Sequence, residues 1–495
     1  MGLAGEPRSV MSDEPGARVL QAAVTETLVR RDRDGEFVAR LAEEVPTFAN
    51  GGLRVVIDDA TPQGRLVATF EIRAGAKWQD GAPITTGDVR FALDEDRAAP
   101  PGSERRWMAD RVERIDLLDD RSVRFVYRAG ERWELYPLAP RVLPAHVLAN
   151  ATAEKRAAYD REPMHAGPFA VAAWIAGFGM TLSAFQSYVG GTPGLGRIEV
   201  RFYLDRGSVV DALRRGEIDI APSPAIEADL ARTLDRFADG TRLQAHYTAA
   251  TAVEMLRVGR RGALAEGRVR MALLVAIDRR GLVDGLFAGR ARVPRSYLVP
   301  PHPVAIDVLD PPRLDRDGAR AMLAAAGLRP GNLGVLERDG ERMSITLQVA
   351  AGSQARMDAA RRVAGDLATS GIAASVLERS LADVRAAVSR GDFDLALVPE
   401  PTDDPQQASE RYRGSVDAWF DVLVDAASDA REQPDKRAIY GELQRLWAHA
   451  LPGIPLYQQL LVDVAPRALE GVQPSPYGDP LTWNARDWRF VTNLN

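Results

Sequence analysis

A chain of 495 residues is too long for a single hydrophobic core and predicts two to four domains. Its hydrophobic content of 46% and charged content of 27% are those of an ordinary globular protein, and a net charge of -6 argues against a nucleic acid as the main partner. The absence of cysteine excludes disulfides, thiolate nucleophiles and thiolate metal ligands.

The N-terminal region carries no recognisable targeting segment. Residues 1–20 lack the apolar stretch of a signal peptide. No apolar run elsewhere approaches the ~20 residues that span a bilayer. Taken alone, these two features predict a cytoplasmic protein.

The first third of the chain predicts helices and strands around one motif. Residues 19–28 carry a helical pattern, residues 53–72 contain two strand-like runs, and residues 122–127 alternate as a strand. Residues 70–93 read as a strand, a glycine-marked turn and a helix that Thr85 and the residues after it can cap.

The middle of the chain predicts a group of strands and a short helix. Strand-like runs occupy residues 169–174, 180–185 and 198–203. A helix capped by Ser208 and stopped by Gly216 then leads into a predicted strand at residues 218–220.

The last half alternates between helix and strand. Residues 268–289 and 315–327 have helical patterns, and a final long helix spans residues 435–450. Between them the alternation runs through strands at residues 345–349, 372–377 and 393–398 and helices at residues 354–370 and 381–390. This spacing predicts right-handed crossovers and a parallel sheet.

Three of these segments resemble motifs of one family. Residues 70–93 (FEIRAGAKWQDGAPITTGDVRFAL) match the pattern F-x-L-R-x-G-V-K-F-x-D-G-x-P-h-T-A-x-D-V-x-F-S-L. Residues 213–220 resemble L-x-x-G-E-I-D-I, and residues 268–289 resemble V-R-x-A-L-x-x-A-I-D-R-x-x-L-V-x-x-h-x-x-G. These are motifs of the extracytoplasmic solute-binding proteins that serve ABC importers, in the peptide, nickel and oligosaccharide class.

The resemblance covers essentially the whole chain and implies an α/β fold of the periplasmic-binding-protein type, with two lobes around a ligand cleft and an extra third domain. Carried onto this sequence, a discontinuous lobe I comprises residues 1–28, 165–247 and 468–495, the extra domain II comprises residues 29–164, and lobe II comprises residues 248–467. The chain is expected to cross between the lobes near residues 247–253 and 462–469.

The N-terminus departs from the family pattern. Relatives begin with a signal peptide and a strand that leads into an x-E-P-x-x-L-x-P loop, which residues 5–10 resemble. We therefore expect the preceding strand to be missing, by truncation of the chain. The resemblance also places the protein outside the cytoplasm, in the periplasm or on the outer face of the cell membrane.

A search for catalytic residues finds no constellation. The five histidines show no metal-ligand spacing, and no phosphate loop, nucleophile elbow or dinucleotide pattern occurs. We therefore expect no enzymatic activity, no cofactor and no metal site.

Ligand contacts are expected in the loop after the predicted strand at residues 393–398, because ligands of open parallel sheets bind beyond the carboxyl ends of the strands. In peptide-binding relatives this loop resembles W-x-x-D-x-x-x-P, whose aspartate takes the peptide amino group. Alignment on Pro405 leaves both the tryptophan and the aspartate absent here. Glu400, Asp403 or Asp404 could supply the charge from a shifted position, and a solvated loop is an equal alternative.

A second departure concerns the carboxylate end of the ligand. Dipeptide-binding relatives place an arginine after the strand that corresponds to residues 345–349, whereas residues 350–353 offer only small side chains. A free dipeptide is thus disfavoured, and a longer peptide, a sugar or another modified solute remains open. Trp419, Tyr412 and Tyr247 are candidate aromatic contacts, with core packing as the alternative.

The sequence thus predicts a monomeric receptor that closes on a peptide or peptide-like solute and delivers it to an ABC permease. An oligosaccharide or metal-chelate receptor is the alternative within the class. A ligand sensor or an enzyme on an α/β frame is the alternative outside it.

Overall fold

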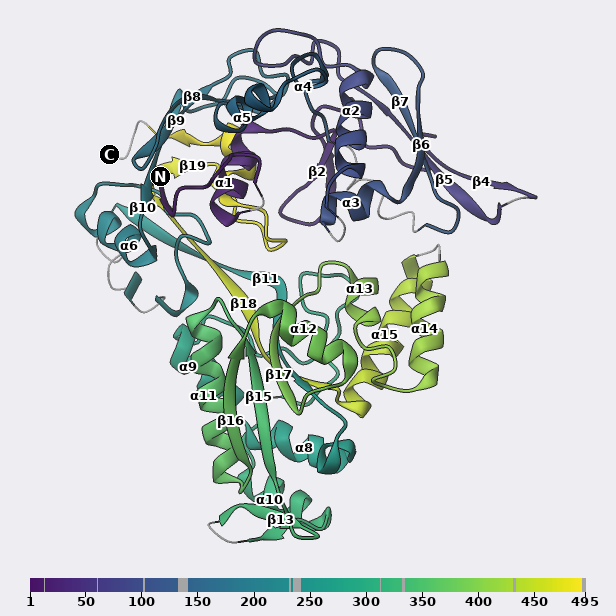
Figure 1. Ribbon diagram of the computed structural model, residues 1–495, viewed down its shortest axis with the longest axis vertical. Coiled ribbons are helices and arrows are strands. Elements are labelled where there is room, and N and C mark those ends of the chain that lie inside the picture. Colours follow the sequence, from purple (N-terminus) through teal and green to yellow (C-terminus); the bar gives the residue numbers. More distant parts are fainter. Residues whose placement is uncertain are drawn as a thin grey trace.

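The computed structural model shows two bodies joined by two long strands (Figure 1). It describes residues 1–12, 14–59, 61–100, 103–131, 141–230, 233–234, 242–311, 313–331, 334–430 and 433–491. The upper body holds the elements from β1 to α6 and the C-terminal segment, and the lower body holds the elements from α8 to α15.

One sheet of the upper body contains the chain's first strand. Its order is β1-β10-β9-β8, formed by β1 (Gly2–Ala4), β8 (Phe169–Ile175), β9 (Gly179–Ala184) and β10 (Arg197–Tyr203). β1 runs parallel to β10, with Leu3 opposite Phe202. The expectation that the strand before residues 5–10 is missing is therefore wrong, because residues 2–4 form it.

The N-terminal and C-terminal segments share a core beside this sheet. α1 (Pro15–Val24) packs on η5 (Leu481–Asp487), and the buried residues of both join those of the sheet in one cluster. The Thr482 hydroxyl donates to the Val19 carbonyl at 2.5 Å. The C-terminal pair of strands, β19 (Leu469–Glu470) and β20 (Arg489–Phe490), lies next to this cluster (Figure 1).

The second sheet of the upper body carries the motif at residues 70–93. Its order is β4-β5-β7-β6, formed by β4 (Leu53–Asp58), β5 (Thr61–Glu71), β6 (Val112–Leu117) and β7 (Ser122–Tyr127). β5 ends in the turn, and α2 (Thr86–Arg97) begins in a capping box in which the Thr85 backbone N–H donates to the Asp88 carboxylate at 2.8 Å. The predicted strand, turn and capped helix are confirmed.

Short elements complete the upper body. They are β2 (Val29–Arg31) and β3 (Phe37–Ala39), which form a hairpin, and α3 (Glu104–Ala109), α4 (Ala145–Leu148), α5 (Ala153–Arg161) and α6 (Arg206–Arg215). The cap of α6 is Asp205 rather than the predicted Ser208, because the Asp205 carboxylate accepts the Ser208 N–H at 2.8 Å. The predicted strand at residues 218–220 is also wrong, and only Ala221 bridges to Val464.

The sheet of the lower body is mixed. Its order is β16-β15-β17-β11-β18, formed by β11 (Leu243–Val258), β15 (Ser344–Ala350), β16 (Ala373–Arg379), β17 (Leu395–Pro401) and β18 (Gly453–Pro466). The three predicted strands β15, β16 and β17 are parallel, as expected. β11 and β18 run antiparallel to their neighbours, because these two strands come from the connections to the upper body.

Helices cover both faces of the three parallel strands. α11 (Gln354–Thr369) contacts β15 and β16, and α12 (Leu381–Arg390) contacts β15 and β17. The lower body also contains α8 (Gly267–Ala276), α9 (Arg279–Phe287), α10 (Arg316–Ala325), α13 (Pro405–Glu410), α14 (Ala418–Asp429) and α15 (Gln433–Ala450). Leu395 and Leu397 of β17 join the main cluster with α9 and α11, whereas Ala396 and Val398 face Val384 of α12. Such strands read as continuous apolar runs because both faces are buried.

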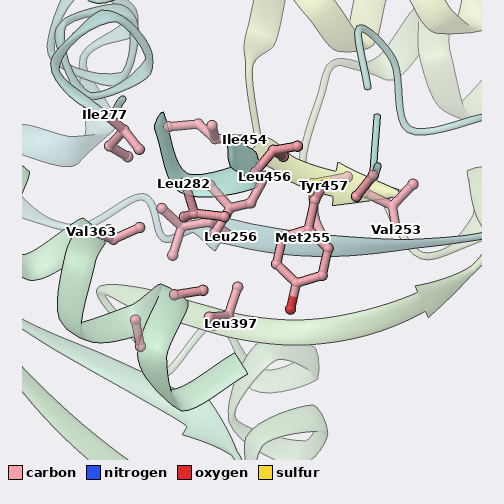
Figure 2. Packing of buried hydrophobic residues seen from close by; sticks show 14 of the residues in the cluster. Val253, Met255, Leu256, Ile277, Leu282, Val363, Leu397, Ile454, Leu456 and Tyr457 are labelled. Carbon is pink, nitrogen blue, oxygen red and sulfur yellow. The ribbon is translucent and has the colours of Figure 1, made fainter. Parts of the chain in front are cut away.

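The main core includes residues of β17, β11 and β18, which are consecutive strands of the sheet. Figure 2 shows Leu256 of β11, Leu456 of β18 and Leu397 of β17 together, with Leu282 and Val363 from the covering helices. The remaining short strands, β12 (Arg329–Pro330), β13 (Leu336–Arg338) and β14 (Glu341–Arg342), form a separate sheet.

The two crossings occur on paired strands. β11 and β18 are hydrogen-bonded from the Leu243–Pro466 pair to the Arg257–Gly453 pair, with irregular register near Val253. Figure 1 shows both strands running from the upper body into the lower one. The domain boundaries given above stay a prediction. Within the part of the chain described, no helix is both long and apolar enough to cross a membrane.

Candidate ligand-binding cleft

Glu400 lies in the core of the lower body. Its carboxylate pairs with the Arg257 guanidinium, with 3.0 Å between Nη1 and Oε1, and accepts the Tyr412 hydroxyl at 2.7 Å. The side chains of Glu400 and Arg257 are 7% and 5% exposed. Both carboxylate oxygens of Glu400 are therefore engaged by residues of the same body.

Tyr412 belongs to the same buried group. Its ring centroid lies 5.2 Å from that of Tyr297 and 5.8 Å from that of Trp447, and the Arg257 guanidinium stands 4.1 Å from it. Burial, together with the charge of Glu400, raises the pKa of Tyr412 well above its usual value. Of the two readings given for Tyr412, these contacts favour core packing.

Asp403 faces the upper body instead. Its Oδ2 lies 3.9 Å from Nη1 of Arg31, which ends β2 in the upper body. The Arg31 guanidinium also lies 5.3 Å from the ring centroid of Phe37 and 4.9 Å from that of Tyr477. We call Arg31, Phe37, Tyr477 and Asp403 the Arg31 cluster, since they meet between the two bodies.

Electrostatics at the cluster follow from partial burial. Burial raises the pKa of Asp403, and the Arg31 guanidinium opposes that rise. His302, within electrostatic reach of Arg31 and Asp404, has its pKa lowered to about 4 by burial. The imidazole is thus neutral at physiological pH, and Arg31 and Asp403 carry the opposing charges of the cluster.

Asp404 serves a local role next to the cluster. Its carboxylate caps α13 by accepting the N–H groups of Gln406 at 2.9 Å and Gln407 at 3.1 Å. The negative charge nonetheless stays in the loop that faces the upper body.

The two other aromatic candidates are accessible. Trp419, in the first turn of α14, is 55% exposed. Tyr247 is half-buried on β11, with the Arg290 guanidinium 4.2 Å from its ring centroid. It lines a cavity of about 670 Å³ beside the β2–β3 turn, to which Arg33 and Asp34 also contribute.

The upper body adds a cavity of about 510 Å³ that shares Arg31, Phe37 and Tyr477 with the Arg31 cluster. We call it the upper cavity. Five arginines line it: Arg18, Arg30, Arg31, Arg105 and Arg141. Sequence reasoning missed this set, although Arg30 and Arg31 are adjacent in the chain.

Carboxylates neutralise part of this charge. Arg141 binds Asp96 with 2.8 Å between Nε and Oδ2. Glu26, also in the lining, is itself paired with Arg40 at 3.1 Å and accepts the Tyr188 hydroxyl. Among the described residues, Arg18, Arg30 and Arg105 form no ion pair, so the upper cavity carries a surplus of positive charge.

Two bodies linked by paired strands, with charged groups facing each other between them, define a two-lobed α/β binding protein. The sequence profile of the bacterial extracellular solute-binding proteins, family 5 Middle, matches residues 36–418, and the chain belongs to this family. The resemblance and the fold class predicted from the sequence are thereby confirmed.

The chain is similar to known proteins along most of its length. It is 28% identical to Protein XP55 of Streptomyces lividans over 90% of this chain and 80% of that protein. It is 25% identical to the oligopeptide-binding protein AppA of Bacillus subtilis over 99% of this chain and 90% of that protein. The crystal structure of NikA from Brucella suis in complex with Fe(III)-EDTA superposes with a TM-score of 0.81 at 20% identity and covers 99% of both chains.

Proposed function

We propose that the protein is the ligand receptor of an ABC importer and that it captures a peptide or peptide-like solute between its two bodies. Family membership and the similarity to an oligopeptide-binding protein over 99% of the chain support this role. The receptor works outside the cytoplasm as a monomer, presents the closed form to the membrane permease and leaves the solute chemically unchanged.

The observation that carries the proposal is the pair of opposite charges between the bodies. Asp403 on the lower body supplies a carboxylate for a ligand ammonium group, in place of the aspartate that the family pattern puts at Pro401. Arg30 and Arg31 on the upper body supply guanidinium groups for a ligand carboxylate. A peptide carries an ammonium group and a carboxylate, so it would pair with Asp403 on the lower body and with the arginines on the upper body.

Closure follows from the same arrangement. A ligand that contacts both bodies binds the closed state more tightly than the open state, and that difference in affinity shifts the population toward the closed state. The irregular register of β11 and β18 near Val253 marks a place where the paired strands can bend.

The positive surplus of the upper cavity favours a second candidate, an anionic metal chelate. In such a ligand the chelator supplies the metal ligands and the arginines bind its free carboxylates. Among the described residues, no group of three or more histidine, aspartate or glutamate side chains is placed to hold a metal ion directly. The metal would thus have to arrive already chelated.

Native mass spectrometry of the purified protein, followed by thermal shifts and calorimetry with peptides and with anionic chelates, separates the two candidates. If the peptide proposal is right, peptides of four or more residues raise the melting temperature. Asp403→Asn and Arg31→Gln then each weaken binding about tenfold or more, because each removes a charged hydrogen-bonding group.

Chelate binding that Arg31→Gln weakens and Asp403→Asn leaves unchanged would favour the second candidate. If neither ligand class stabilises the protein, the proposed ligand is wrong. Trp419→Ala and Tyr247→Phe, measured in the same series, test whether these two predicted contacts touch the ligand.

A further inference from the structure

One buried arginine in the lower body, Arg279, forms no ion pair with any of the described residues. Arg279, the first residue of α9, is 3% exposed, and its described partner is the Pro455 carbonyl, which accepts from Nη1 at 3.3 Å. Burial lowers the pKa of Arg279 to about 10, with no nearby charge of either sign contributing to the shift. One long hydrogen bond to a carbonyl uses little of the donor capacity of a guanidinium.

A buried charge without an opposite charge beside it is unfavourable, so the hydrogen bond to the Pro455 carbonyl leaves Arg279 incompletely explained. By comparison, the buried Arg257 and Arg356 of the same body each hold a carboxylate, from Glu400 and Glu254 respectively. Arg279 differs from both in that it lines a cavity.

This cavity, of about 1000 Å³, is separate from the cleft between the bodies, and we call it the α8–α15 cavity. Its walls are α8, the C-terminal end of α15 and the loop residues 306–311, 313 and 315. α8 and the neighbouring α10 lie toward the lower end of the molecule, away from the upper body (Figure 1). Much of the lining is apolar, with contributions from Leu274, Val275, Ile306, Leu309 and Ala448.

The other charges in the lining are largely accounted for. Asp307 pairs with Arg295 at 2.8 Å, and Arg445 pairs with Glu442 at 2.9 Å. Asp315 caps α10 by accepting the Gly318 N–H at 2.8 Å. Arg313, Asp310 and His449 are exposed at the mouth. Arg279 is thus the buried charge of an otherwise apolar interior.

We propose that the α8–α15 cavity is a second ligand site, which takes an amphiphilic carboxylate with its anionic group on Arg279 and its hydrocarbon part against the apolar lining. The two halves of the site match the two halves of such a ligand: a carboxylate pairs with the guanidinium, and the chain removes apolar surface from water. This site would be independent of the solute bound between the bodies.

Octanoate, octylamine and 1-octanol are suitable probes, because they share a chain and differ in the head group. Isothermal titration calorimetry on the full-length protein should show saturable one-to-one binding of octanoate and at least tenfold weaker binding of the other two. Arg279→Gln should weaken octanoate binding at least tenfold. Arg279→Lys keeps the positive charge and should weaken octanoate binding less than Arg279→Gln does.

Two further variants guard against misfolding and surface effects. Ala448→Phe places a bulky side chain in the apolar lining without removing a charge, and it should weaken octanoate binding at least tenfold even if Arg279→Gln does not fold. Arg280→Gln is the matched control, because it removes the same charge one residue along the helix, from a side chain that is 73% exposed. This variant should bind octanoate as the wild type does.

The proposal is overturned if the wild type does not bind octanoate at millimolar concentration, or if Ala448→Phe binds it as tightly as the wild type. It is equally overturned if Arg280→Gln weakens binding as much as Arg279→Gln, since general attraction to surface charge would then explain the result.

Discussion

Replacing Glu400 with glutamine tests whether this carboxylate serves the core of the lower body. The substitution removes the charge that neutralises the Arg257 guanidinium, whose side chain is 5% exposed. Breaking a buried ion pair by removing one partner costs about 3–5 kcal/mol. In a cooperative unit of about 150–250 residues, 1 kcal/mol corresponds to about 2–4 °C, so a loss on the order of 10 °C in melting temperature is expected.

Asp403→Asn is the matched comparison, because it removes the same charge three residues further along the chain, in the loop after β17. Asp403 lies 3.9 Å from Arg31 with a side chain that is 42% exposed, so its loss should cost at most about 1 kcal/mol. Differential scanning calorimetry with and without ligand measures both effects. Glu400→Gln should melt early and keep the ligand-induced rise, whereas Asp403→Asn should melt normally and lose most of it.

The reasoning is refuted if Glu400→Gln melts within about 2 °C of the wild type and loses the ligand-induced rise. That result would make Glu400 a ligand contact and would require the buried pair to open when ligand binds.

Three further predictions concern pH, backbone packing and the exposed tryptophan. Burial raises the pKa of Asp463 to about 7, whereas an unfolded chain has about 3.9, so the folded state binds this proton more tightly and stability falls as pH rises from about 4 to about 7. Asp463→Asn should therefore gain on the order of 3 kcal/mol relative to the wild type between pH 4 and pH 8 in urea unfolding, and an unchanged difference would contradict the assignment. Gly167→Ala should destabilise the protein by about 1–3 kcal/mol, because its Cβ would lie 2.3 Å from the Val24 carbonyl oxygen. Gly365→Ala, at an exposed position inside α11 with nothing within 4 Å of the new Cβ, should instead stabilise the protein by about 1 kcal/mol. If the two variants change the free energy of unfolding equally, the clash at Gly167 is not the cause. Trp419→Ala should change stability by less than about 0.5 kcal/mol, because the side chain is 55% exposed. If Trp419 contacts the ligand, the fluorescence change on ligand addition should disappear with it.

Local signals in the sequence predicted local structure well. Thr85 and Asp88 are three residues apart, which is the spacing of a capping box at a helix start, and the capping box forms there. α12 spans Leu381–Arg390 as expected, because Ser380 caps it and Gly391 ends it with a left-handed backbone. The error at Ser208 arose because Asp205, three residues earlier, is an equally good cap.

Long-range partners could not be read from the sequence. Glu400 was a ligand candidate because it was predicted to lie in an acidic loop, but it lies on β17 and pairs with Arg257 of β11, which is distant in the chain. Likewise, β11 and β18 turn a parallel sheet into a mixed one, although each is only a strand-like run when seen alone. The arginines of the upper cavity come from α1, β2, α3 and the segment before α4, so no single stretch signals them.

The core shared by α1 and η5 sets an order of events during synthesis. Leu3, Val19 and Leu20 are buried against Leu481 and Trp488, near the opposite end of the chain. On the ribosome the N-terminal segment emerges first and can pack on β8 and β10 once these strands have been made, but its contact with η5 must wait for the end of the chain. The core of the lower body is completed by β18, which ends at Pro466, so we expect this body to fold before the core shared by α1 and η5 is complete. The face of α1 that η5 covers would then stay accessible to chaperones until η5 has been made.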